Sequence, residues 1–239
     1  MLEQLNLENI LFLDIETVPE YETYQILPEE LKLLWGQKAS FLSKDGSTPE
    51  DIYDRAGIYA EFGKIVCIST GILTRENNWR FRMKSFSGED EKQLLSDFIE
   101  LLNSHYNKPK HLLCAHSGKE FDFPFIARRI LINGLKLPAA LAIAGKKPWE
   151  IPHLDTLELW KFGDYKHYSS LNLLAAIFGI PTPKDDINGK DVCKVFYEQK
   201  NLERIVAYCQ KDVLTVAQLI LKYRGENIID GQNVTIVKG

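Results

Sequence analysis

"ILFLDIETVPEY", residues 10–21, ends an apolar run with an aspartate and a glutamate and follows them closely with a proline. The run is short and rich in β-branched and aromatic residues, which predicts a buried strand over residues 9–15. Because side chains at i and i+2 of a strand point the same way, Asp14 and Glu16 are expected to project together. A buried carboxylate needs a cation or several hydrogen bonds to stay ionised, so this pair requires a partner.

The chain around this stretch has the size and composition of one globular unit. It has 239 residues, of which 45% are hydrophobic and 26% charged, and a formal net charge of -4. A single domain over residues 1–239 is therefore expected. The acidic balance argues against binding of nucleic acid by overall charge, so any basic groove has to be local.

The N-terminus and the cysteines indicate a soluble cytoplasmic protein with no membrane partner. Met1 is followed by "LEQLNLEN", which has no basic or apolar character of a signal peptide, and no run of 18 apolar residues occurs. The four cysteines form no C-x-x-C pair, so they are predicted to be reduced core thiols rather than zinc ligands or disulfides. They are Cys67, Cys114, Cys193 and Cys209.

The order of strand and helix patterns predicts an α/β fold with a mixed sheet flanked by helices. Residues 18–63 carry two Pro-Glu starts and helical apolar spacing, which predicts a helical and loop insertion after the first strand. Residues 64–73 and 79–86 are predicted to form a hairpin, since "TRENN" between them is prone to turn. Residues 225–239 are expected to be a tail or an added edge strand.

Further helices and strands are predicted between the hairpin and the tail. A helix is expected after Ser87 as its N-cap, and residues 111–116 are apolar enough for a strand. Helical patterns then begin at Asp122, with a proline in the first turn, and recur three times between residues 169 and 224.

Two more acids stand in positions that suit an active site, although each also has a structural interpretation. Asp122 lies between phenylalanines at the start of a predicted helix, where an N-cap carboxylate would be ordinary. Asp212 lies inside a helix with Tyr208 one turn earlier on the same face, where a solvated acid and a core tyrosine would also be ordinary. Together with Asp14 and Glu16, they supply the oxygen ligands that Mg²⁺ or Mn²⁺ prefers.

Three segments occur in the order "FLDIET", "HSGKEFD" and "YCQKD". This order resembles the three motifs of the DEDD superfamily of 3′-to-5′ exonucleases, which have a ribonuclease H-like fold. The resemblance covers about residues 9 to 220 and is closest to predicted exonucleases related to the proofreading domain of family-B DNA polymerases. It implies that Asp14, Glu16, Asp122 and Asp212 bind metal.

The third motif resembles the branch of the superfamily that carries tyrosine four residues before the last aspartate, here Tyr208. The second motif departs from the usual pattern, because Ser117 stands where an asparagine is common after a histidine. A serine hydroxyl is shorter than the amide of asparagine and cannot make the paired hydrogen bonds of an amide, so substrate binding is expected to differ.

The resemblance also implies the cofactor and the chemistry. Two divalent ions, Mg²⁺ or Mn²⁺, would activate a water and stabilise the departing 3′ oxygen of a phosphodiester. Asp14 would bridge both ions, Glu16 and Asp212 would complete one, and Asp122 would hold the other partly through water. Tyr208 would orient the attacking water as a neutral phenol. Asp155 is expected to support the site without binding metal.

The candidates for substrate contact are Thr17, His116, Ser117 and Phe121. Phe121 is a candidate for stacking on a terminal base, although a phenylalanine at a helix start is more often core. Residues 108–147 hold eight basic residues against two acids, which could follow a single-stranded backbone or could be solvated surface.

Three functions are therefore open. The first is a 3′-to-5′ exonuclease on single-stranded DNA ends, acting in proofreading or repair with a polymerase or repair partner in trans. The second is the same chemistry on RNA, from which DNA differs by the 2′-OH group. The third is a nucleic-acid-binding module with weak or no catalysis.

Overall fold

The computed structural model describes residues 2–43, 46–164, 168–181 and 187–237. Its centre is a six-stranded mixed sheet in the order β5-β4-β1-β2-β3-β6. The strands β1, β2 and β3 form an antiparallel meander, whereas β4, β5 and β6 join their neighbours in parallel. The strands are β1 Ile10–Pro19, β2 Gly63–Arg75, β3 Trp79–Ser87, β4 Leu112–Ala115, β5 Leu154–Asp155 and β6 Val234–Ile236.

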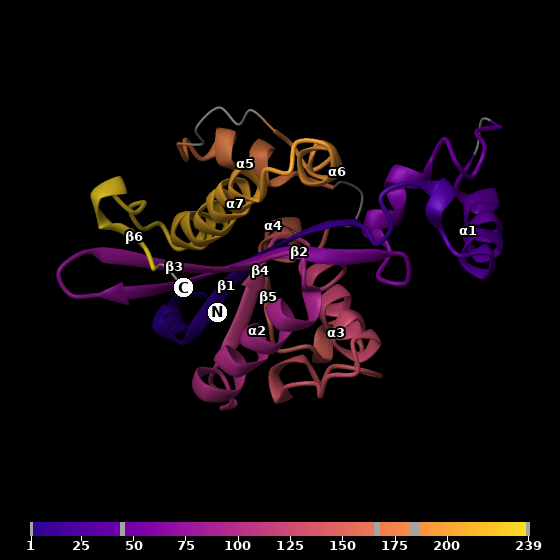
Figure 1. The fold of residues 1–239 in the computed structure, drawn as a ribbon. Helices are drawn as coiled ribbons and strands as arrows, with labels where there is room; N and C mark the ends of the chain where they lie inside the picture. Colours follow the sequence, from indigo (N-terminus) through magenta and orange to yellow (C-terminus); the bar gives the residue numbers. More distant parts are fainter. Residues whose placement is uncertain (1, 44–45, 165–167, 182–186, 238–239) are drawn as a thin grey trace.

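Helices cover both faces of the sheet, which confirms the predicted α/β architecture of a mixed sheet flanked by helices. Figure 1 shows α5, α6 and α7 on one face and α2 and α3 on the other. The helices are α1 Glu29–Leu42, α2 Glu91–His105, α3 Asp122–Ile132, α4 Thr156–Lys161, α5 Leu171–Ile177, α6 Val192–Tyr197 and α7 Leu202–Tyr223. None of the helices in the described part of the chain is long and apolar enough to cross a membrane.

Strand β1 is buried on both faces, which explains its nearly continuous apolar sequence. Leu11, Leu13 and Ile15 pack with α2 and α3 in one core cluster. Ile10 and Phe12 pack on the other face, with α7. Because side chains alternate along a strand, the acids at positions 14 and 16 share the face of Ile10 and Phe12, and α7 covers that face.

Several boundaries differ from those predicted. The first strand continues to Pro19, because its far end pairs with β2 as far as Gly63. The predicted N-cap Ser87 is wrong: Ser87 is the last residue of β3, and the side chain of Asp90 caps α2 by accepting from the backbone N–H of Gln93. The tail does add an edge strand, since β6 pairs with β3.

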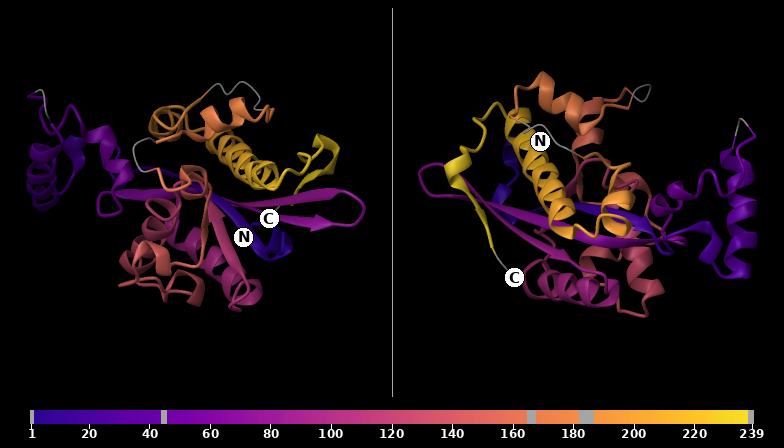
Figure 2. Two further views of the ribbon diagram at one scale, coloured as in Figure 1. Left: turned by 180° about the vertical axis from the view of Figure 1, so that it is seen from behind. Right: turned by 45° about the horizontal axis from the view of Figure 1, so that its top comes forward.

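The predicted insertion is a lobe built from α1 and the short 3₁₀ helices Tyr24–Ile26 and Tyr53–Ile58. Figures 1 and 2 show it projecting beyond one end of the sheet, apart from the two helical layers. It has a core of its own, in which Trp35 is fully buried against Tyr53 and Phe62. The lobe is therefore a packed unit that begins just after the Asp14–Glu16 pair.

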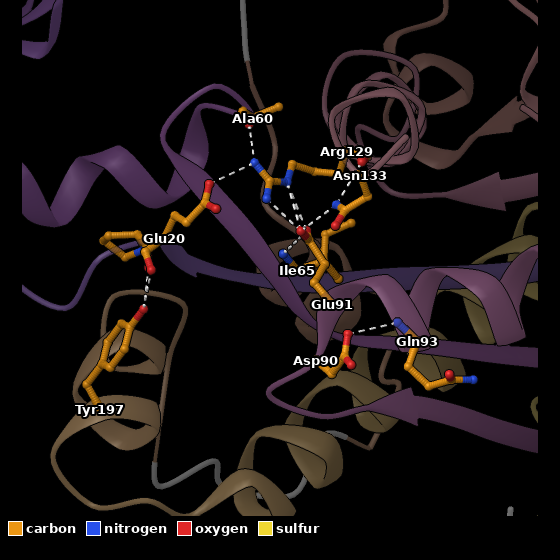
Figure 3. Close-up of polar contacts among 10 residues, drawn as sticks. Glu20, Ala60, Ile65, Asp90, Glu91, Gln93, Arg129, Asn133 and Tyr197 are labelled. Carbon is orange, nitrogen blue, oxygen red and sulfur yellow. Dashed lines mark hydrogen bonds and ion pairs between the residues drawn. The ribbon is translucent and has the colours of Figure 1, made fainter. Parts of the chain in front are cut away.

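A buried ion-pair network ties this lobe to the domain (Figure 3). Arg129, on α3, is 2% exposed and donates to both carboxylate oxygens of Glu91 at 2.6–3.1 Å. The same guanidinium donates to Glu20 at 3.1 Å and to the carbonyl of Ala60 at 2.9 Å, which lie at the two ends of the lobe. Glu91 also accepts from the backbone N–H of Ile65 at 2.7 Å.

Candidate active site

Strand β1 carries Asp14 and Glu16 on the face that α7 covers. Glu16 is 7% exposed, and Asp14 is half-buried. The pairing register of β1 with β2 shifts between Glu16 and Thr17, so Val66 of β2 has no partner in β1. Such a bulge bends a strand locally and is common beside active sites. The two carboxylates thus lie where the strand changes direction.

Helix α7 supplies the next group of side chains. Tyr208 and Asp212 lie one helical turn apart, and the hydroxyl of Tyr208 hydrogen-bonds to Asp212. Cys209 lies between them in the sequence and contacts Asp14, with Sγ at 3.4 Å from both the backbone carbonyl and the Oδ2 atom. Strand β1 and helix α7 therefore meet through their motif residues.

Asp122 joins the cluster from α3. It is 3% exposed and is the first residue of the helix, so it is not the N-cap; that position is held by Phe121. The backbone N–H groups of Asp122 itself and of Ile15 on β1 favour the charged form of this carboxylate. Asp122 thus lies beside the strand that carries Asp14 and Glu16.

Burial raises the pKa values of these acids most, and the charges of neighbouring acids raise them further. Burial raises the pKa of Asp14 well above its ordinary value, and the charges of Glu16, Asp212 and Asp122 add to that effect. Burial also raises the pKa of Glu16 well above its ordinary value, with Asp212 the largest neighbouring charge. Burial raises the pKa of Asp122 to about 7, partly offset by its backbone hydrogen bonds. The Tyr208 pKa is raised by burial and by Asp212, so its hydroxyl stays neutral.

The residues present fit divalent cations. Ligand atoms of Asp14, Glu16 and Cys209 lie within 4.8 Å of one another. Within the described ranges, no ion pair joins Asp14, Glu16 or Asp122 to a lysine or arginine. A cluster of carboxylates without a cationic side chain is the environment in which a bound metal stabilises the charged form.

The raised pKa values predict how stability depends on pH and metal. A carboxyl with a raised folded-state pKa stabilises the metal-free protein fully below its unfolded pKa, and that stabilisation is lost as pH rises through the folded value. For Asp122 this window runs from 3.8 to about 7. Thermal unfolding should therefore show a larger increase in Tm on adding Mn²⁺ at about pH 8 than at about pH 6, because protons no longer compete for the ligands. An equal increase at both pH values would contradict metal binding by these acids.

Asp155 organises the loop that precedes Asp122. Its carboxylate is buried and accepts from the backbone N–H groups of Ser117 at 3.0 Å and Lys119 at 3.1 Å. It also caps α4 through Leu157 and Glu158. Ser117 has a φ of 61°, a left-handed conformation that an asparagine also tolerates, and the bond to Asp155 holds it there.

The four substrate candidates are placed differently. Thr17 is half-buried at the bulge beside Glu16. His116 has both ring nitrogens within 2.9 Å of protein partners, Thr156 Oγ1 and the Ser169 carbonyl, so a phosphate contact would cost one of these bonds. Ser117 lies in the loop before Asp122, where its backbone N–H donates to Asp155. Phe121 is half-buried and packs on Phe125 with ring centres 5.4 Å apart, as a core residue would.

Three residues of this region were not predicted from the sequence to belong to the site. Cys209 could have been noticed, because it lies three residues before Asp212 and therefore near the same helical face. Cys67 lies opposite Glu16 in the sheet, a pairing that depends on the register across the insertion. Trp149 is 75% exposed in a loop joined to the Asp155 region, since Lys119 donates to the carbonyl of Pro148 at 3.4 Å.

Fold and site together define an α/β domain with a carboxylate cluster suited to divalent cations. The chain belongs to the family described as predicted 3′-5′ exonucleases related to the exonuclease domain of PolB, which residues 58–229 match. That segment includes Asp122, Tyr208 and Asp212, whereas Asp14 and Glu16 precede it.

Two DNA polymerases are similar to parts of this chain. A DNA polymerase of Pyrococcus glycovorans is 20% identical over 142 residues, which are 54% of this chain and 18% of that polymerase. The family B DNA polymerase from the hyperthermophilic archaeon Pyrobaculum calidifontis has a TM-score of 0.48 and 14% identity, over 90% of this chain and 24% of that one. The chain thus spans less than a quarter of the length of either polymerase.

Proposed function

We propose that this protein is a metal-dependent 3′-to-5′ exonuclease that removes nucleotides from the 3′ ends of single-stranded DNA. The observation that carries the proposal is the meeting of Asp14, Glu16, Asp122 and Asp212 from β1, α3 and α7. Within the described residues, no ion pair joins Asp14, Glu16 or Asp122 to a lysine or arginine, and Tyr208 lies against the cluster. Family membership supports the same chemistry.

Each side chain has a role in this proposal. Asp14, Glu16, Asp122 and Asp212 would hold two divalent ions, Mg²⁺ or Mn²⁺, which when bound activate water and stabilise charge on the phosphate and the leaving oxygen. Tyr208 holds a hydroxyl proton next to the carboxylates and can position the attacking water by a hydrogen bond. Because its pKa is raised, it acts as a donor and an orienting group rather than as a base.

The direct test is a time course with 5′-labelled single-stranded DNA and RNA of matched sequence, in Mn²⁺, Mg²⁺ or EDTA. A ladder that shortens from the 3′ end, requires metal and is faster on DNA is the expected result. A faster rate on RNA would replace the DNA assignment by an exoribonuclease. If both oligonucleotides are bound but stay intact with either metal, the protein is a binding module and the proposal fails.

A loop near the site offers a surface for single-stranded DNA. Trp149 is 75% exposed, and the Nζ atom of Lys147 lies 5.3 Å from its ring centre. The carbonyl of Pro148 accepts from Lys119, whose backbone is held by Asp155. An exposed aromatic beside a cation is the usual platform for a base and its phosphate in single-strand binding. Of the other basic residues in this stretch, Arg129 is buried and bound by acids.

Replacing Trp149 by alanine should therefore weaken binding of single-stranded DNA by about 1–3 kcal/mol, measured by fluorescence anisotropy in EDTA. Phe41→Ala is the matched control, because Phe41 is 86% exposed on α1 of the insertion lobe and should change binding less than about twofold. Equal losses of DNA affinity in the two variants, or no loss in Trp149→Ala, would contradict binding of the DNA strand over this loop.

A further inference from the structure

Two thiols lie beside the carboxylates of the proposed site. Cys209 and Cys67 are both fully buried and pack in the same core cluster. Cys209 Sγ is 3.4 Å from Asp14 Oδ2, and Cys67 faces Glu16 across the β1–β2 pairing. Cys209 therefore adds a sulfur donor to the two carboxylates, and Cys67 lies beside them.

The spacing of these donors suits one small cation. Asp14, Glu16 and Cys209 each offer a ligand atom, and these atoms lie within 4.8 Å of one another. Zinc with bonds of about 2.0–2.3 Å places tetrahedral ligand atoms roughly 3.5 Å apart. The 3.4 Å separation of Cys209 Sγ from Asp14 Oδ2 already has this length. Small side-chain movements would bring in Glu16.

The donor set separates two kinds of cation. Mg²⁺ and Mn²⁺ prefer oxygen ligands in octahedral geometry and make no use of a thiol. Zn²⁺ accepts sulfur and carboxylate together in a four-coordinate site, and binds more tightly than Mn²⁺ to a given set of donors.

The geometry points to Cys209 as the sulfur ligand of a zinc site that it forms with Asp14 and Glu16, with Cys67 beside it, so that Zn²⁺ inhibits the enzyme. The inhibition rests on the proposed exonuclease function, whereas zinc binding does not. As the Zn–S bond forms, the thiol proton of Cys209 leaves to solvent, because a coordinated thiol is held as the thiolate. Asp14 and Glu16 are then bound to a four-coordinate ion and are withdrawn from the oxygen-coordinated ions that hydrolysis uses.

Binding is tested with Co²⁺, which replaces zinc and gives a near-ultraviolet charge-transfer band only when sulfur coordinates it. The wild-type protein should show this band and lose it on adding Zn²⁺, and Cys209→Ala should lack it. Cys193→Ala is the matched control: Cys193 is a half-buried thiol on α6 and its removal should leave the band unchanged. No band in the wild type, or an undiminished band in Cys209→Ala, overturns the proposal.

A second measurement covers the case in which Cys209→Ala does not fold. X-ray absorption of the zinc-loaded wild-type protein should show a sulfur neighbour at about 2.3 Å, and a shell of oxygen and nitrogen alone would overturn the proposal.

The inhibitory effect is measured separately, as the Zn²⁺ concentration that halves Mn²⁺-supported hydrolysis. Relative to its own zinc-free rate, Cys209→Ser should need at least about tenfold more Zn²⁺ than the wild type, and equal sensitivity would overturn inhibition through sulfur. If the wild type hydrolyses nothing, the proposed function fails, while the cobalt spectrum still decides whether Cys209 binds metal.

Discussion

Asp14→Asn is expected to lower the rate of 3′-end hydrolysis by at least about 10³-fold, a loss of about 4 kcal/mol of transition-state stabilisation. The charges of Glu16, Asp212 and Asp122 all act on Asp14. Asparagine keeps the shape and removes the charge that holds the cations. The measurement is the initial rate on 5′-labelled single-stranded DNA in saturating Mn²⁺.

Two controls separate lost chemistry from lost folding. Asp97→Asn changes an exposed acid on α2 and should leave the rate within about twofold of the wild type. In the absence of metal at about pH 8, Asp14→Asn should also be at least as stable as the wild type, because it removes a carboxylate whose pKa burial raises. A rate above a tenth of the wild-type value in the folded variant would exclude Asp14 as a metal ligand.

Arg129→Met should produce the largest loss of stability, about 3–5 kcal/mol in the free energy of unfolding. The substitution leaves Glu91, which is 7% exposed, buried without its cation. It also removes the hydrogen bond to the carbonyl of Ala60 and the ion pair with Glu20. The measurement is urea unfolding at neutral pH.

The neighbouring arginine provides the control for this variant. Arg128 is exposed on the same helix, so Arg128→Met should change the free energy of unfolding by no more than about 0.5 kcal/mol. The double variant Arg129→Met, Glu91→Gln should recover part of the loss, because no unpaired charge is then buried. Equal stabilities for Arg128→Met and Arg129→Met would show that the network in Figure 3 does not hold the lobe.

Local patterns were enough to predict the sheet and the two main motif elements. β1 and α7 have strong apolar periodicity, and the positions of their acids follow from the strand and helix repeats. The mixed α/β fold and the hairpin of β2 and β3 were predicted for this reason, whereas residues 225–239 were left open as a tail or an added edge strand. The end of the first strand differs from the prediction, because pairing with β2 extends β1 to Pro19.

Contacts between distant segments were not predictable in the same way. The N-cap of α2 was assigned to Ser87 instead of Asp90, because both are suitable caps and the length of β3 decides between them. Arg129 was counted as part of a basic surface, and its burial depends on Glu91 and on the lobe. The contact of Cys209 with Cys67 requires α7 to lie on β2, and no spacing in the sequence shows this.

The attachment of the insertion lobe affects how the chain folds. β1 and β2 cannot pair until the chain has closed across residues 20–62. The entropy of closing such a loop grows only slowly with length, by about 0.6 kcal/mol for each doubling. A lobe with its own core around Trp35 is therefore tolerated at this point, and so would be a longer or differently shaped one. The surface next to the carboxylates can thus change in evolution while the strands and helices that hold them stay the same.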